Sequence, residues 1–190
     1  MSNIGFALTG SFCTFDKSIV QMGNLQHAGH NVTAIMSDNA YHMDTKFGTA
    51  ESFKKRITDI TGRKIIASIQ QAEPIGPHKM FDILLVEPCS GNTLAKLAAG
   101  IVDTPVLMAI KSHLRNARPV LIAVSTNDAL GNAAKNIGLL LNVRNIYFVP
   151  MGQDDTYHKP RSVVADFNMT ELAINAALEG VQLQPILKTY

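Results

Sequence analysis

Short, continuous apolar runs alternate with segments of helical periodicity along the chain. Such runs are typical of buried strands, and the periodic segments are typical of amphipathic helices. The runs that predict strands cover residues 4–9, 31–36, 81–87, 119–125 and 145–149. The segments that predict helices cover residues 15–28, 51–61, 92–99, 105–116, 132–141 and 168–179. Gly29 and Gly62 directly follow the first two helices, where a glycine commonly ends a helix. Residues 64–69 fit a helix or a short strand, and the polar stretch 151–162 predicts a loop.

Strands that are separated by helices predict a parallel sheet with helices on both faces. We therefore expect an α/β protein with a single-domain, doubly wound parallel sheet over residues 1–190, including a C-terminal helix and tail from about residue 166. In such sheets ligands bind at the carboxyl ends of the strands, near the point where the strand order reverses. The residues that follow each strand are therefore the first place to look for function.

The composition is that of an ordinary globular protein, with 46% hydrophobic and 17% charged residues. A formal net charge of +2 predicts no strong attraction to nucleic acid or to a membrane surface. No apolar run reaches the ~20 residues of a membrane span, since Asp103 interrupts the best candidate. The first residues lack the basic region of a signal peptide, so we expect a cytoplasmic protein. The two cysteines make neither a disulfide framework nor a zinc set.

Hydroxyl and amide side chains gather after four of the predicted strands. The four segments are Thr9-Gly10-Ser11-Phe12-Cys13-Thr14, Ser37-Asp38-Asn39, Pro88-Cys89-Ser90-Gly91-Asn92-Thr93 and Ser125-Thr126-Asn127-Asp128. In the first segment, a glycine and three hydroxyls precede a helix, whose N-terminal N–H groups attract anions. A tight turn with a helix cap explains the same residues. Taken together, the four segments favour a polar cofactor site over a hydrolytic centre.

Sequence motifs of several other activities are missing. No G-x-G occurs, so the dinucleotide-binding fingerprint is absent, and there is neither a P-loop nor a G-x-S-x-G motif. The six histidines show no metal-ligand spacing, and we expect no metal site. Cys13 and Cys89, at predicted strand ends, fit either a catalytic thiol or small half-buried residues. Lys111 and Arg115 share one helix face and form either an anion-binding edge or a solvated surface.

The segment Pro88–Thr93 resembles the Pro-Ala-Ser-Ala-Asn-Thr motif of the homo-oligomeric FMN-binding cysteine-decarboxylase superfamily. The Thr9-Gly10-Ser11 turn and Ser37 are similar to the phosphate-binding elements of that superfamily. Longer stretches, over residues 103–116, 124–131 and 145–154, resemble the B-subunit family of the dipicolinate synthases of spore-forming bacteria. The resemblance covers essentially the whole chain.

The resemblance implies a flavodoxin-like, three-layer Rossmann fold with a pocket for FMN. By matched position, it assigns the phosphate to Thr9, Gly10, Ser11 and Ser37. It places the cofactor ring and the substrate beside Ser90, Asn92 and Thr93, with Asn92 as the catalytic residue that orients a ring or a substrate carbonyl. A plain helix cap at the start of the predicted helix 92–99 is the alternative role for Asn92. The remaining residues that it assigns to the cofactor are Phe12, Ser125 and Asn127.

The same resemblance implies a reaction in sporulation, the dehydrogenation of dihydrodipicolinate to dipicolinate. This chain would act together with a dipicolinate synthase A subunit, which supplies the NAD(P) site, and would form a homo-oligomer. Because the substrate is a dicarboxylate, Lys111, Arg115 or the loop 159–161 are candidates to bind it. Two alternatives stay open: a stand-alone FMN-dependent decarboxylase or flavin prenyltransferase relative, and a non-catalytic subunit that stabilises its partner.

Overall fold

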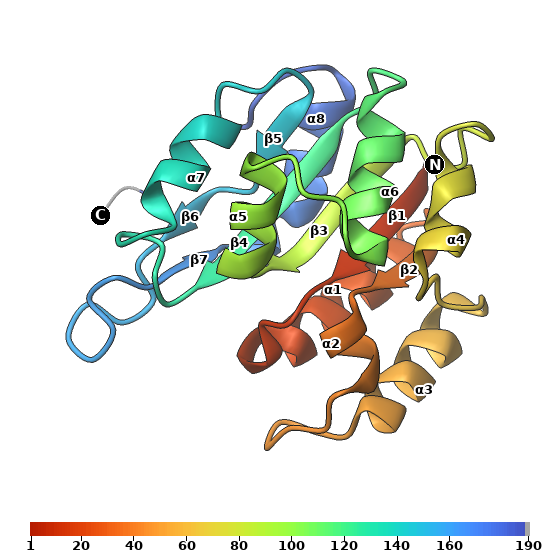
Figure 1. The fold of residues 1–190 in the computed structure, drawn as a ribbon, viewed down its shortest axis with the longest axis horizontal. Helices are drawn as coiled ribbons and strands as arrows, with labels where there is room; N and C mark the ends of the chain where they lie inside the picture. Colours follow the sequence, from red (N-terminus) through yellow and green to blue (C-terminus); the bar gives the residue numbers. More distant parts are fainter. Residues whose placement is uncertain (189–190) are drawn as a thin grey trace.

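A mostly parallel sheet of seven strands forms the centre of the computed structural model, which describes residues 1–188 (Figure 1). The strands are β1 (Asn3–Leu8), β2 (Asn31–Met36), β3 (Ile83–Cys89), β4 (Val120–Thr126), β5 (Ile146–Phe148), β6 (Met151–Gly152) and β7 (Val163–Ala165). They lie in the order β2-β1-β3-β4-β7-β6, and β5 pairs with β4 in parallel. All seven residues of β3 are buried, as expected of the central strand of a sheet that is covered on both faces.

Helices cover both faces of this sheet. One face carries α1 (Phe15–His27), α3 (Ala50–Thr61) and α8 (Thr170–Leu178), and the other carries α4 (Ile69–Ala72), α5 (Gly91–Ala98) and α6 (Pro105–Leu114). Figure 1 shows α5 and α6 in front of the strands, with α8 behind them. The short α2 (Asp38–His42) follows β2, and α7 (Ala134–Leu140) packs on α5. Single 3-10 turns complete the described elements: η1 (Phe12–Thr14), η2 (Glu73–Ile75) and η3 (Phe167–Met169).

The elements form where the hydrophobic pattern predicts them. The five predicted strands and six predicted helices are confirmed, with ends that differ by one or two residues at most sites. Gly29 and Gly62 take positive φ angles of 88° and 63°, a backbone conformation that glycine adopts without strain. Both therefore end their helices as predicted. The ambiguous stretch 64–69 contains only a single β-bridge, between Ile66 and Ile35, before α4 begins.

One edge of the sheet differs from the prediction. The sequence predicts parallel strands and a loop over residues 151–162, but β7 pairs antiparallel with β4, and β6 pairs antiparallel with β7. These strands have only two and three residues, too few for an alternating pattern to be recognisable. The antiparallel pairing carries the connecting loop away from the sheet, at the lower left of Figure 1.

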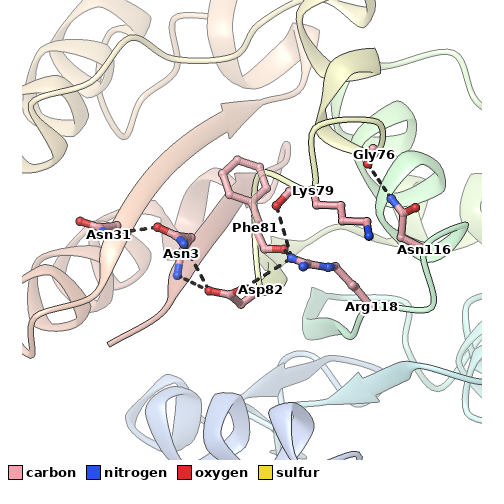
Figure 2. A network of polar contacts seen from close by, with 8 residues as sticks. All are labelled: Asn3, Asn31, Gly76, Lys79, Phe81, Asp82, Asn116 and Arg118. Atoms are coloured by element: carbon pink, nitrogen blue, oxygen red, sulfur yellow. Dashed lines mark hydrogen bonds and ion pairs between the residues drawn. The ribbon is translucent and has the colours of Figure 1, made fainter.

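A polar network fixes the amino ends of the central strands (Figure 2). The carboxylate of Asp82 accepts a 2.8 Å hydrogen bond from the backbone N–H of Asn3 and pairs with Arg118 at 3.5 Å. Arg118 also donates to the backbone carbonyl of Phe81. These contacts join the starts of β1, β3 and β4. The carboxyl ends of the same strands lie at the opposite edge of the sheet, where the connecting segments diverge.

Among residues 1–188, no helix is both long and apolar enough to cross a membrane.

Candidate functional site

The strand order reverses at β1, which lies between β2 and β3. The chain leaves β1 toward β2 and later returns to β3 on the other side, so the segments that follow β1 and β3 separate at the carboxyl edge. Thr9 joins these two strand ends. Its hydroxyl donates to the carbonyl of Pro88 at 2.8 Å and accepts from the N–H of Ser90 at 2.9 Å. Thr9 is buried and lines neither of the cavities described below, and its hydroxyl is engaged in this contact between the two strand ends.

Two cavities, of about 950 and 300 Å³, open at this edge of the sheet. Both volumes are typical of small-molecule sites. Gly10, Ser90 and Asn92 line both cavities. The larger one is also lined by the predicted residues Ser11, Phe12, Ser125 and Asn127, and the smaller one by Ser37 and Thr93. Nine of the ten residues predicted for catalysis and cofactor binding therefore line one or both of these cavities, although they come from four separate segments.

Hydroxyl groups tie one wall of the larger cavity together. The Ser11 hydroxyl donates a 2.6 Å hydrogen bond to the backbone carbonyl of Ser125, which connects the turn after β1 to the end of β4. The hydroxyls of Thr14 and Ser125 lie 3.1 Å apart, within hydrogen-bond distance. The hydroxyl proton of Ser11 is thus already used inside the protein. An anion on this turn would be bound by backbone N–H groups and the start of α1 rather than by that proton.

The segment that follows β3 exposes the side-chain amide of Asn92. Ser90 caps α5: its hydroxyl oxygen accepts from the backbone N–H of Thr93 at 3.3 Å. Asn92 is the second residue of α5 and is exposed. Its side chain forms no hydrogen bond within residues 1–188. Asn92 is therefore not the helix cap. Its donor and acceptor groups are available to a ligand in either cavity.

Gly91 brings this helix start close to the end of β4. A Cβ atom at this position would lie 2.8 Å from the hydroxyl oxygen of Thr126. Real Cβ atoms do not approach so closely, so any larger residue would push the two segments apart. Gly91, Asn92, Thr126 and Asn127 all line the larger cavity, so this close approach lies in its wall.

Ser37 and Phe12 also have partners within the protein. The Ser37 hydroxyl accepts from the N–H of Ala40 at 3.4 Å and caps α2. The ring of Phe12 lies 5.1 Å from that of Phe15 and continues a row of aromatic rings to Phe53. Phe12 is partly buried in the core and lines the larger cavity with the rest of its surface.

Lys111 and Arg115 lie elsewhere. Helix α6 begins at the carboxyl edge and runs back, so its last turn reaches the amino edge, where Asn116 donates to the carbonyl of Gly76 at 2.7 Å (Figure 2). Neither cation lines either cavity. Lys111 lies in the last turn of α6 and Arg115 directly follows the helix, so the direction of α6 places both away from the two cavities. Of the third candidate, the loop 159–161, the structure brings Lys159 to the larger cavity.

Sequence reasoning missed several charged residues of the larger cavity. These are Lys17, Lys46 and Asp154, whereas Asp128, which also lines this cavity, belongs to the predicted segment after β4. Lys17 follows the predicted anion-binding turn by one helical turn, which is a signal that could have identified it. Lys159 pairs with Asp154 at 3.6 Å. Three lysines against two aspartates leave the wall of the cavity with a surplus of positive charge, which favours an anionic ligand.

The titratable groups of the described residues limit the chemistry. No group of three or more His, Cys, Asp or Glu side chains in residues 1–188 could hold a metal ion. The Cys89 thiol is buried, and burial raises its pKa, which argues against a catalytic thiolate there. The carboxyl of Glu87 accepts a 2.7 Å hydrogen bond from Thr170 of α8 and lies outside both cavities. The two cavities together therefore offer amides, hydroxyls, lysines, four aspartates and the thiol of Cys13.

Comparison with known proteins agrees with this geometry. The family described as Flavoprotein matches residues 1–167. The B subunit of dipicolinate synthase from Bacillus subtilis (strain 168) is 44% identical over 184 residues, which are 97% of this chain and 92% of that protein. The crystal structure of the dipicolinate synthase B subunit from Bacillus halodurans C superposes with a TM-score of 0.91 at 41% identity, covering 99% of this chain and 96% of that one.

More distant structures share the fold. Burkholderia xenovorans DmrB, solved in complex with FMN and described as a cubic protein cage for redox transfer, has a TM-score of 0.70 at 17% identity and covers 94% of this chain and 96% of its own. The match over residues 1–167 includes every segment of the carboxyl edge that lines the two cavities. The chain belongs to the flavoprotein family and, within it, to the family of dipicolinate synthase B subunits.

Proposed function

We propose that this chain is the B subunit of a dipicolinate synthase and acts with an A subunit to dehydrogenate dihydrodipicolinate to dipicolinate. The observation that carries the proposal is the 44% identity to the B subunit of a dipicolinate synthase over 97% of the chain. The cationic cavity at the reversal of strand order supports it, because the substrate is a dicarboxylate.

The reaction requires more than this chain contains. Aromatisation of the dihydropyridine ring removes one hydride and one proton, and the hydride needs an acceptor. The sequence holds no dinucleotide-binding fingerprint, so we assign the NAD(P) site to the A subunit. On this proposal, the cavities of this chain hold and orient the ring of the substrate.

The donor set at the carboxyl edge fits FMN. The turn that contains Gly10 and Ser11 precedes α1 and would hold the phosphate together with Ser37, while the free amide of Asn92 suits the polar edge of a flavin ring. Phe12 offers an aromatic surface in the larger cavity, and Ser90, Thr93, Ser125 and Asn127 complete the lining. When bound there, a flavin supplies a two-electron acceptor close to the substrate.

The subunit mixture tests the proposal. Purified chain, purified A subunit and their mixture are each supplied with dihydrodipicolinate and NADP, with and without added FMN, and dipicolinate is measured by its ultraviolet absorption. We expect rapid turnover only in the mixture. Rapid turnover by this chain alone favours the stand-alone flavoenzyme, and a mixture no faster than the A subunit alone contradicts the proposal. A yellow chain after mild purification supports a resident flavin, and sedimentation of the same sample tests self-association.

A further inference from the structure

Two lysines of the larger cavity carry charge that no carboxylate of the described residues neutralises. Lys17 lies on α1, and Lys46 lies in the connection between α2 and α3. Both line the cavity, and neither forms an ion pair within residues 1–188. The third lysine, Lys159, differs from them because it pairs with Asp154.

The acidic groups closest in sequence to the two lysines are engaged elsewhere. Asp16 precedes Lys17 directly, but its carboxylate pairs with Arg56 at 2.6 Å. Asp44 lies two residues before Lys46, but its carboxylate accepts a 2.8 Å hydrogen bond from the backbone N–H of Ala50. Neither lysine therefore has a carboxylate of the described residues within ion-pair distance.

The position of Lys46 is fixed by a tight turn. The backbone N–H and carbonyl groups of Thr45 and Gly48 bond to each other at 3.0 and 3.1 Å, which puts Lys46 and Phe47 at the tip. Gly48 lies directly on the ring of Phe53, since a Cβ atom there would approach the ring to 2.8 Å. Phe53 is fully packed in the core. The turn is thus anchored, and the backbone of Lys46 is held at the cavity.

We infer that Lys17 and Lys46 bind the two carboxylates of a planar dicarboxylate ring and so determine the specificity of this site for its substrate. The inference rests on the proposed function, which it extends by naming the groups that recognise the substrate. One cation serves each carboxylate, and the two cations come from different elements, so together they fix the direction of the ring. Asn92 then contacts the ring from the helix start that lines the same cavity.

Kinetics of the two-subunit enzyme test this inference. Lys17→Met, Lys46→Met and the double variant keep the length of the side chain and remove its charge. Each single variant is expected to raise the KM for dihydrodipicolinate roughly three- to tenfold with little change in kcat. Inhibition by dipicolinate should weaken by the same factor, while inhibition by picolinate, which has one carboxylate, should change less in the double variant. Lys64→Met is the matched control, because Lys64 is exposed and lines neither cavity.

Other outcomes separate the possible errors. An unchanged KM in the double variant overturns the inference and leaves the proposed function intact. A weaker affinity for FMN or for the A subunit, with KM unchanged at saturation, also overturns it, because the lysines then bind the phosphate or the partner. If the wild-type mixture is inactive, the proposed function fails. Calorimetric titration then compares the affinity of the wild-type and double-variant chains for dipicolinate. Equal affinities refute the inference that the lysines bind its carboxylates.

Discussion

The hydroxyl of Ser11 donates a 2.6 Å hydrogen bond to the backbone carbonyl of Ser125, 114 positions further along the chain. The bond closes the cavity wall between the turn after β1 and the end of β4. Its donor is the same hydroxyl that a sequence-based interpretation assigns to the phosphate of a cofactor. The loss of this hydroxyl should therefore affect the stability of the wall first.

Ser11→Ala should lower the free energy of unfolding by about 1 kcal/mol, because one partly buried hydrogen bond is lost. Affinity for FMN should fall only to the extent that the loss of this bond destabilises the cavity wall. Urea unfolding and an FMN titration on the same preparation measure both quantities. A large loss of FMN affinity with unchanged stability would show instead that the hydroxyl contacts the ligand directly.

Gly91→Ala should destabilise the protein by about 1–3 kcal/mol, since the added methyl group would lie 2.8 Å from the Thr126 hydroxyl oxygen. Removal of that hydroxyl should relieve the contact. A double-mutant cycle of Gly91→Ala and Thr126→Ala, measured by urea unfolding, should therefore show that the two changes together cost less than their sum. Strict additivity would contradict the close approach of the two segments.

Glu87 should make stability depend on pH. Burial raises the pKa of its carboxyl from 4.5 to about 8, so the folded protein holds a proton that the unfolded chain releases. The resulting stabilisation is fully present below about pH 4.5 and is lost as the pH rises through about 8. Glu87→Gln keeps the shape and cannot titrate. The difference in unfolding free energy between wild type and variant should therefore shift in favour of the variant across this interval, and a constant difference would refute it.

Ser90→Ala should cost about 1 kcal/mol of stability through the loss of the α5 cap. Thermal unfolding measures the effect. Ser90→Asp retains a capping oxygen and should stay close to the wild type in stability. Equal losses in the two variants would indicate that the hydroxyl stabilises the helix in another way, for example through its contact with Thr93 at 3.1 Å.

The sequence predicts the main elements because their burial is continuous or strictly periodic. Residues 31–36 form β2 as predicted, whereas Met151–Gly152 and Val163–Ala165 become strands only through pairing with each other and with β4. Their existence depends on contacts between distant segments, which no local pattern encodes.

The candidate site was predictable to a similar degree. The hydroxyl and amide segments come together because parallel strands end at one edge, which is a general property of the fold. The position of Lys46 depends on the packing of its turn against Phe53, and that of Lys111 on the direction of α6, so neither followed from spacing along the chain. The choice of Ser90 rather than Asn92 as helix cap depends on the extended backbone of Ser90, with φ −76° and ψ 157°.

Activity of the two-subunit enzyme with Asn92→Ser, measured beside its melting temperature, tests most directly whether the cleft of this chain takes part in the reaction. Ser90, not Asn92, caps α5, so the substitution should leave the melting temperature nearly unchanged. The substitution removes the Asn92 amide, which offers a donor and an acceptor to both cavities. Dipicolinate formation should therefore fall sharply. Full activity in the serine variant, with the same melting temperature, would contradict the assignment of the site.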